Sequence, residues 1–490
     1  MLLEKIYNQS PIFIQNLMVS IKGQQIHNSR YLSHSHEEAL RILEANERSS
    51  LAILQELQFR QLRSFIEHCY NLSPYYRRKF EIHGLVPKDI REPENVSRIP
   101  VTPKADLRAQ TEAFFTAKID RRMVAVHTSG TTGSPITVYF SREDIGKRFA
   151  FLERCRRWAS VHVGQRRASF TGQSIVPEGQ EAAPFWRYNR PGNQLLFSSY
   201  HLSPDHLPSY AMALEKFSPE IIEGYPSAIH VLAEYLIRNN LSGLVKPHAI
   251  LVSAETVLPH QRHAIEQAFQ AKLYNQYASS EGAPFIGECG AGRLHVHLDS
   301  GFIEILRSDG TPAQAGETGE MVVTSFTSHV TPLLRYAIGD VAESAAVAAE
   351  CPCGLPFPTV QAVVGRVDDI LFTPDRGFVG RLDTVFKKLP NSIVEAQIIQ
   401  TSERRIALRL VPDRKKYQSE HATLVVVEMR KRLGQAVKIE VEEIEQIPRS
   451  ANGKMRAVIN LCRGSLPQSL RYSEEKTEVI STLDNDSTVG

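Results

Sequence analysis

The stretch His127-Thr128-Ser129-Gly130-Thr131-Thr132-Gly133-Ser134-Pro135 places five hydroxyl side chains and two glycines in nine positions. Glycine lets backbone N–H groups approach an anion closely, and Ser and Thr hydroxyls donate to its oxygens. The stretch therefore predicts a loop that holds a polyphosphate, which makes ATP the first ligand to consider. No Gly-Lys-[Ser/Thr] follows the turn, so the loop does not fit the Walker pattern. A polar, glycine-rich surface turn is the alternative explanation.

The composition is that of an ordinary globular protein. Of the 490 residues, 42% are hydrophobic and 23% are charged, and the formal net charge is +3. A chain of this length exceeds the size at which one hydrophobic core keeps growing, so we expect two or more domains. No apolar run approaches the roughly 18 residues that a membrane span needs, and the start lacks a secretory leader pattern. We therefore expect a cytoplasmic protein with no membrane span and no nucleic-acid partner.

Hydrophobic periodicity divides the chain into four parts. Residues 1–95 repeat apolar positions at helical spacing, which predicts a helical N-terminal region. Residues 96–366 alternate short Val- and Ile-rich runs with helical stretches, which predicts a large, multi-layer α/β domain with mixed β-sheets. Residues 367–464 combine short strands with one amphipathic helix, as expected of a small, mobile α+β domain. Residues 465–490 are polar, which predicts a flexible tail.

Four more segments follow the loop in a fixed order: Tyr274–Glu281, Arg335–Asp340, Gly365–Asp369 and Pro448–Lys454. Together with the loop they resemble the ordered signature of the adenylate-forming superfamily, which includes acyl-CoA synthetases, nonribosomal peptide adenylation domains and luciferases. The resemblance spans residues from about 95 to 460. The segments SPYYRRKF and TPKADLR resemble the phenylacetate–CoA ligase branch, and GRLDTVFKKLPNSIVEAQIIQ resembles its CapK-like subgroup.

The resemblance implies a site for ATP and Mg2+. Tyr277 would stack on the adenine, Asp340 would bind the ribose hydroxyls, and Glu281 would hold Mg2+ against the phosphates. The remaining residues that the resemblance places at the nucleotide are Ser129, Gly130, Thr131, Thr132, Gly133, Ser253, Ala254, Glu255, Ala278, Ser279, Ser280 and Arg366.

The resemblance also implies a reaction. A carboxylate would attack the α-phosphorus of ATP, releasing pyrophosphate and leaving an acyl adenylate. Lys454 would contact the carboxylate and the α-phosphate, and with Thr128 and Glu281 it forms the expected catalytic set. The terminal domain would then rotate about Asp368, so that the acyl group passes to CoA or to an amine. A role in polysaccharide or secondary-metabolite biosynthesis would suit this chemistry.

The sequence departs from the family pattern in ways that leave alternatives open. Ala278 replaces the glycine usual after the tyrosine, and TPDRGFVGRLD replaces the usual glycine-containing segment after Asp369, which puts thioester formation with CoA in question. Adenylyl transfer to a cofactor or metabolite and a non-catalytic nucleotide-binding scaffold are the competing hypotheses. Because two-fold dimers are the commonest homo-oligomers, we expect a homodimer.

The cysteine spacing predicts a separate metal site. Cys351 and Cys353 form a short chelating pair, and Cys289 with His295 would complete a tetrahedral set for structural Zn2+. His297 competes with His295, because alternation along a strand directs both side chains to one face. A loop of inert free thiols is the alternative.

Overall fold

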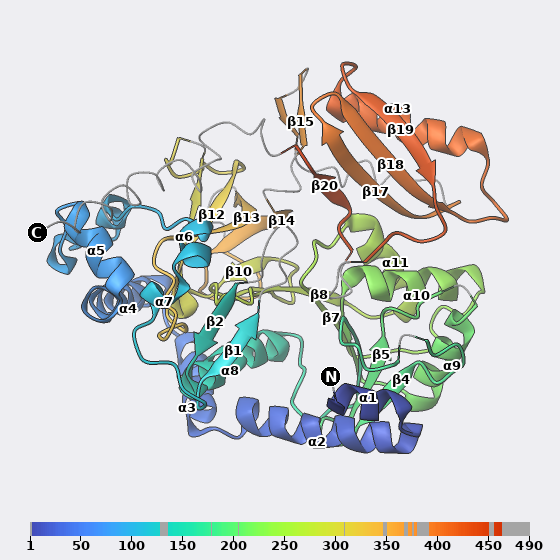
Figure 1. The fold of residues 1–490 in the computed structure, drawn as a ribbon, viewed down its shortest axis with the longest axis horizontal. Helices are drawn as coiled ribbons and strands as arrows, with labels where there is room; N and C mark the ends of the chain where they lie inside the picture. Colours follow the sequence, from blue (N-terminus) through green and yellow to red (C-terminus); the bar gives the residue numbers. More distant parts are fainter. Residues whose placement is uncertain are drawn as a thin grey trace, which may run out of the picture.

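The structure of the chain is a computed structural model, which describes residues 2–127, 136–177, 179–203, 205–307, 309–345, 350–366, 371–374, 377–379, 392–449 and 455–462. Its N-terminal part is helical (Figure 1). The helices are α1 (Leu2–Gln9), α2 (Ile12–Tyr31), α3 (His34–Asn46), α4 (Leu51–Leu72) and α5 (Pro74–Ile82). A serine side chain accepts a hydrogen bond from the third residue of each of α3, α4 and α5, so local sequence sets where these helices begin.

Short elements connect the helices to the main sheet. They are the 3-10 turns η1 (Pro87–Asp89) and η2 (Pro93–Arg98), the helices α6 (Lys104–Ala109) and α7 (Thr111–Phe114), and the antiparallel hairpin of β1 (Val124–His127) and β2 (Thr137–Phe140). His127 is paired with Thr137 at the end of the hairpin. The predicted phosphate loop is therefore the connection between β1 and β2.

One mixed sheet of twelve strands forms the centre of the molecule. In spatial order its strands are β11 (Gly301–Leu306), β12 (Thr318–Ser325), β13 (Tyr336–Ser344), β14 (Thr359–Arg366), β10 (Leu294–Val296), β9 (Ile286–Glu288), β8 (Leu273–Tyr277), β7 (Ala249–Ser253), β6 (Ile221–Gly224), β3 (Arg167–Thr171), β5 (Gln194–Ser198) and β4 (Trp186–Asn189). The run from β8 to β5 is parallel, and all other neighbours are antiparallel.

Helices bury both halves of this sheet. The helices that follow the hairpin are α8 (Arg142–Trp158), α9 (Leu207–Phe217), α10 (Pro226–Arg238) and α11 (Pro259–Phe269), with the 3-10 turn η3 (Leu298–Ser300) further on. Side chains of α9, α10 and α11 share one apolar cluster with the parallel strands, whereas α4 and α5 share another with β12 and β13. Among the parallel strands, the central β7 has the near-continuous apolar sequence Ala-Ile-Leu-Val that a buried parallel strand is expected to have, whereas β3 and β8 also carry polar residues.

The C-terminal part folds around its own core. Its elements are the hairpin β15 (Leu371–Thr373) and β16 (Gly377–Val379), the strands β17 (Ile393–Ser402), β18 (Arg405–Pro412), β19 (Lys438–Glu443) and β20 (Val458–Asn460), and the helix α13 (Ser419–Leu433). The sheet order is β19-β18-β17-β20, and α13 packs on it through Val425 and Met429. Figure 1 shows this domain at the opposite side of the molecule from α2. The predicted fold class, a large α/β domain with a small α+β domain, is confirmed, and the exact domain boundaries remain predictions.

None of the helices within the described residues is long and apolar enough to cross a membrane.

Candidate functional site

The predicted nucleotide residues gather where parallel strands end. β6, β7 and β8 are consecutive neighbours in the sheet and point the same way. Their carboxyl ends carry Gly224, Ser253 and Tyr277. Ligands of open α/β sheets bind at the carboxyl ends of parallel strands, so the strand directions mark this edge as a candidate binding site.

Tyr277 and Asp340 are in direct contact. The Tyr277 hydroxyl donates a hydrogen bond of 2.6 Å to Oδ2 of Asp340, although the two residues lie 63 positions apart. Tyr277 ends β8, and Asp340 lies in β13, so the contact joins the parallel and the antiparallel halves of the sheet. An aromatic ring and a carboxylate at this separation can serve the base and the sugar of one nucleoside.

Glu281 is buried and paired with a lysine that sequence reasoning left without a role. Nζ of Lys104 lies 2.8 Å from Oε1 of Glu281 and donates a second bond, of 3.3 Å, to the Ile338 carbonyl. The Glu281 side chain is 6% exposed and that of Lys104 is 26% exposed. Lys104 opens α6 within the segment TPKADLR, directly after Pro103. The motif was visible in the sequence, but the partner is 177 residues away.

Hydrogen bonds to Ser279 stabilise the turn between Tyr277 and Glu281. Oγ of Ser279 accepts hydrogen bonds from the backbone N–H groups of Gly282 and Ala283, at 3.1 and 2.9 Å. The buried guanidinium of Arg148, from α8, donates to the Ser279 carbonyl at 3.0 Å. Ser280 is exposed at the tip. These bonds hold the backbone of the turn that carries Glu281.

A second turn follows β7 and contains the predicted adenine-edge residues. Ser253 and Ala254 are exposed, and Ala254 adopts a left-handed backbone conformation with φ of 71°. A non-glycine residue in this region stores strain, which persists only where the surroundings demand the turn. The carboxylate of Glu255 points inward and accepts hydrogen bonds from the backbone N–H and the hydroxyl of Ser227. Burial raises the pKa of this carboxyl.

Glu320 is a further acid, beside Asp340. It lies on β12, next to β13, and burial together with the Asp340 charge raises the pKa of Glu320 to about 7. Sequence reasoning missed it, because a single glutamate in a strand carries no pattern.

Several predicted site residues lie outside the described residues: Thr128, Ser129, Gly130, Thr131, Thr132, Gly133, Asp368 and Lys454. Arg366 ends β14, and its backbone is in register with Asp340. The roles assigned to these residues remain predictions.

The four predicted metal ligands converge. The ligand atoms of Cys289, His295, Cys351 and Cys353 all lie within 4.8 Å of one another. Sγ of Cys353 is 3.4 Å from Nε2 of His295, and the opposite ring nitrogen, Nδ1, is 2.7 Å from the carbonyl of Phe357. That carbonyl can accept a hydrogen bond from Nδ1–H, which leaves the Nε2 lone pair free to bind a metal, as is common for metal-ligating histidines.

His297 does not belong to this cluster. Its ring is buried against Arg154 and Cys155, with Nε2 3.4 Å from Sγ of Cys155. β10 ends at Val296, so strand alternation no longer applies at His297. The structure therefore favours His295 among the two candidates.

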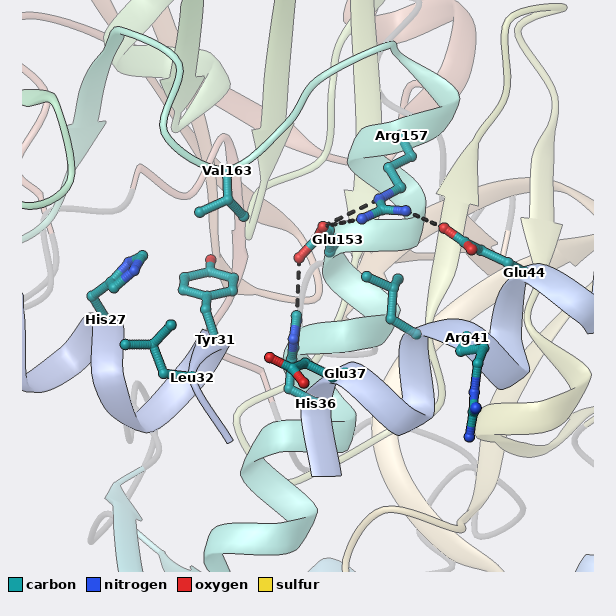
Figure 2. A pocket seen from close by; sticks show the side chains of 11 residues that line it. His27, Tyr31, Leu32, His36, Glu37, Arg41, Glu44, Glu153, Arg157 and Val163 are labelled. Atoms are coloured by element: carbon teal, nitrogen blue, oxygen red, sulfur yellow. Dashed lines mark hydrogen bonds and ion pairs between the residues drawn. The ribbon is translucent and has the colours of Figure 1, made fainter. Parts of the chain in front are cut away.

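A separate cavity of about 400 Å³ lies between α2, α3 and α8 (Figure 2). Several of the charged side chains that line it are paired: Arg157 bridges Glu44 and Glu153, and Glu153 lies 3.1 Å from the ring of His36. None of its lining residues is a predicted site residue. Its charges thus join the N-terminal helices to α8.

The relatives of the chain identify the family. Protein CapK of Staphylococcus aureus is 34% identical over 463 residues, which cover 94% of this chain and 99% of that protein. The chain belongs to the CapK-like branch of the adenylate-forming superfamily. The CapK C-terminal domain family matches residues 371–461, which is the terminal domain described above.

A second relative and a solved structure are also similar to the chain. A phenylacetate–coenzyme A ligase of Thermus thermophilus is 27% identical over 447 residues, covering 83% of this chain and 96% of that protein. The crystal structure of a 2-hydroxyisobutyryl-CoA ligase in the postadenylation state, in complex with R3-HIB-AMP, covers 90% of this chain and 94% of its own, with a TM-score of 0.66 and 19% identity. At that identity the likeness establishes the fold alone.

Proposed function

We propose that this CapK-like protein adenylates a carboxylic acid with ATP and then transfers the acyl group to CoA or to an amine. The convergence of Tyr277, Asp340 and Glu281 on the carboxyl edge of the parallel strands is the observation that carries the proposal. Relatives named phenylacetate–coenzyme A ligase, and a structural neighbour that holds an acyl adenylate, support it. A pathway that builds a polysaccharide or a secondary metabolite would suit such an enzyme.

Some of the site residues would bind the nucleoside, and others would hold the metal ion that neutralises the phosphate charge. Tyr277 would stack on adenine, Asp340 and Arg366 would hold the ribose, and the exposed turn at Ser253 and Ala254 would border the base. The donor set at Glu281, a buried carboxylate, fits Mg2+, a hard cation that prefers oxygen ligands. Bound there, Mg2+ would neutralise phosphate charge.

Positive charge would assist the adenylation step. Lys104 lies beside Glu281 and adds a cation near the expected phosphate position. The loop 128–135, with Thr128, would hold the phosphates, and Lys454 would stabilise charge on the α-phosphate and the attacking carboxylate. Preorganised positive groups of this kind lower the barrier because they need no reorganisation during the reaction. Asp368 would serve as the hinge for the transfer step.

The cysteine cluster is proposed to hold structural Zn2+. Three thiols and one imidazole are a closed tetrahedral set, which leaves no position for a substrate. The cluster joins β9 and β10 to the segment before β14, so a metal would tie distant parts of the sheet together. A cytoplasmic location and a homodimer are further expectations.

Carboxylate-dependent exchange of labelled pyrophosphate into ATP tests the proposed function, with a panel of aryl, hydroxy and amino acids. We expect exchange with one class of acid, and its loss in Lys454→Ala and Glu281→Gln. Exchange with no acid, while nucleotide still binds, would contradict adenylation. A nucleotidylated product found by mass spectrometry would then identify adenylyl transfer, and the absence of any product would indicate a scaffold.

A further inference from the structure

Glu255 joins the core to the terminal domain through one carboxylate. Its Oε1 accepts a hydrogen bond of 2.7 Å from the backbone N–H of Met455, 200 positions away, and one of 3.0 Å from the Ser227 hydroxyl. Its Oε2 accepts from the Ser227 backbone N–H at 3.1 Å. Ser227 lies in the first turn of α10, where free N–H groups and the helix dipole favour a negative charge.

The residues after Glu255 contact both the core and the terminal domain. The Thr256 hydroxyl donates to the carbonyl of Val364, on β14 of the central sheet, at 3.4 Å. Leu258 is buried in the apolar cluster that forms the core of the terminal domain, together with Ile398 and Val425. Residues 255–258 are therefore a docking segment that directly follows the exposed Ser253–Ala254 turn.

We infer that Glu255 is a positioning residue that docks the terminal domain for adenylation, by holding Met455 against the core beside the nucleotide edge. Met455 directly follows Lys454 in the sequence, so docking of Met455 would also limit how far the proposed catalytic lysine can move from the core. The carboxylate itself is occupied by Ser227 and Met455 and does not act on the substrate. The inference rests on the proposed adenylation reaction.

Glu255→Gln tests the docking with little change in size. A carboxylate offers two acceptor oxygens, whereas an amide offers one, so an NH2 group would face the N–H of either Ser227 or Met455. Ser227→Ala is the matched control, because it removes only the hydroxyl and keeps both backbone bonds. Arg238→Gln is a second variant that loosens the same boundary, since Arg238 lies 3.4 Å from Asp413 of the terminal domain.

Amide hydrogen exchange on the full chain measures docking without any substrate. We expect the Met455 amide to exchange about tenfold faster in Glu255→Gln, as loss of one charge-assisted hydrogen bond predicts. In Ser227→Ala the Met455 amide should exchange at the same rate as in the unmutated protein. In Arg238→Gln it should exchange faster, as in Glu255→Gln. Unchanged protection of Met455 both in Glu255→Gln and in Glu255→Ala, which removes both acceptor oxygens, would overturn the inference.

Steady-state pyrophosphate exchange separates positioning from nucleotide binding. We expect Glu255→Gln to lower kcat about tenfold, with the KM for ATP unchanged within about twofold. A raised KM with unchanged kcat would instead place Glu255 at the nucleotide and overturn the inference, as would a faster amide exchange with no loss of kcat. If the unchanged protein shows no pyrophosphate exchange, the proposed function fails, and the Met455 amide alone then decides whether Glu255 docks the domain.

Discussion

Replacing Lys104 by methionine removes the positive partner of Glu281 and keeps the length of the side chain. The two charged atoms are 2.8 Å apart, and only 6% of the Glu281 side chain is exposed. At an effective dielectric of about 20, their attraction is about 6 kcal/mol, much of which offsets the loss of hydration. Breaking a fully buried pair costs about 3–5 kcal/mol. Because the Lys104 side chain is 26% exposed, we expect a cost of about 2–3 kcal/mol.

A double-mutant cycle with Glu281→Gln measures this interaction directly. The free energy of unfolding from urea titrations should fall by about 2–3 kcal/mol in Lys104→Met, because the mutation leaves a buried carboxylate without its partner. In the Glu281→Gln background the same mutation should cost little, since no charge remains to be compensated. We therefore expect a coupling energy of at least about 1.5 kcal/mol. A coupling below about 0.5 kcal/mol would refute the argument that the pair stabilises the empty site.

Three further predictions concern other parts of the site. Tyr277→Phe should change ATP affinity by less than about threefold, because the mutation keeps the ring and loses only the 2.6 Å hydrogen bond to Asp340. Tyr277→Ala removes the ring and should weaken ATP binding more than about tenfold. Calorimetric titration measures both affinities. Glu320 has a pKa of about 7 in the folded chain against the ordinary 4.5, so it holds its proton more tightly when folded and destabilises the fold increasingly as pH rises between these values. Glu320→Gln should therefore raise the melting temperature at about pH 8 and leave it unchanged at about pH 4. Metal analysis should find one zinc per chain and none in Cys351→Ser, which should also melt at lower temperature; an equal melting temperature with and without a chelator would argue against a structural metal.

Much of the fold is encoded in local patterns that can be recognised in the sequence. Serines accept hydrogen bonds at the starts of α3, α4 and α5, and the apolar runs that became β6 and β7 are bounded by turn residues. The terminal domain likewise follows from alternating strands around one amphipathic helix. Such signals depend on neighbours a few positions apart, which is why sequence reasoning detects them.

The contacts that build the site are mostly long-range, and only some could be predicted. The cysteine cluster was predicted because its residues have distinctive chemistry, although the choice of His295 over His297 needed the end of β10. Tyr277 and Asp340 were assigned to one nucleotide through the family resemblance, while their hydrogen bond came from the structure. Lys104 and Glu281 are 177 positions apart, and one lysine among many carries no signal for one partner.

The placement of the site follows from a change of direction in the sheet. β8 runs parallel to β7 on one side and antiparallel to β9 on the other, so the turn after Tyr277 lies where the parallel half ends. This position lets Tyr277 reach Asp340 of the antiparallel half, while the neighbouring β7 turn presents Ser253 and Ala254 at the same edge. Because that β7 turn continues directly into the segment that bonds Met455, the proposed nucleotide contact and the position of the terminal domain would depend on the same few residues. Nucleotide binding at the β7 turn would therefore bias the position of the terminal domain directly, with no need for a longer pathway through the core.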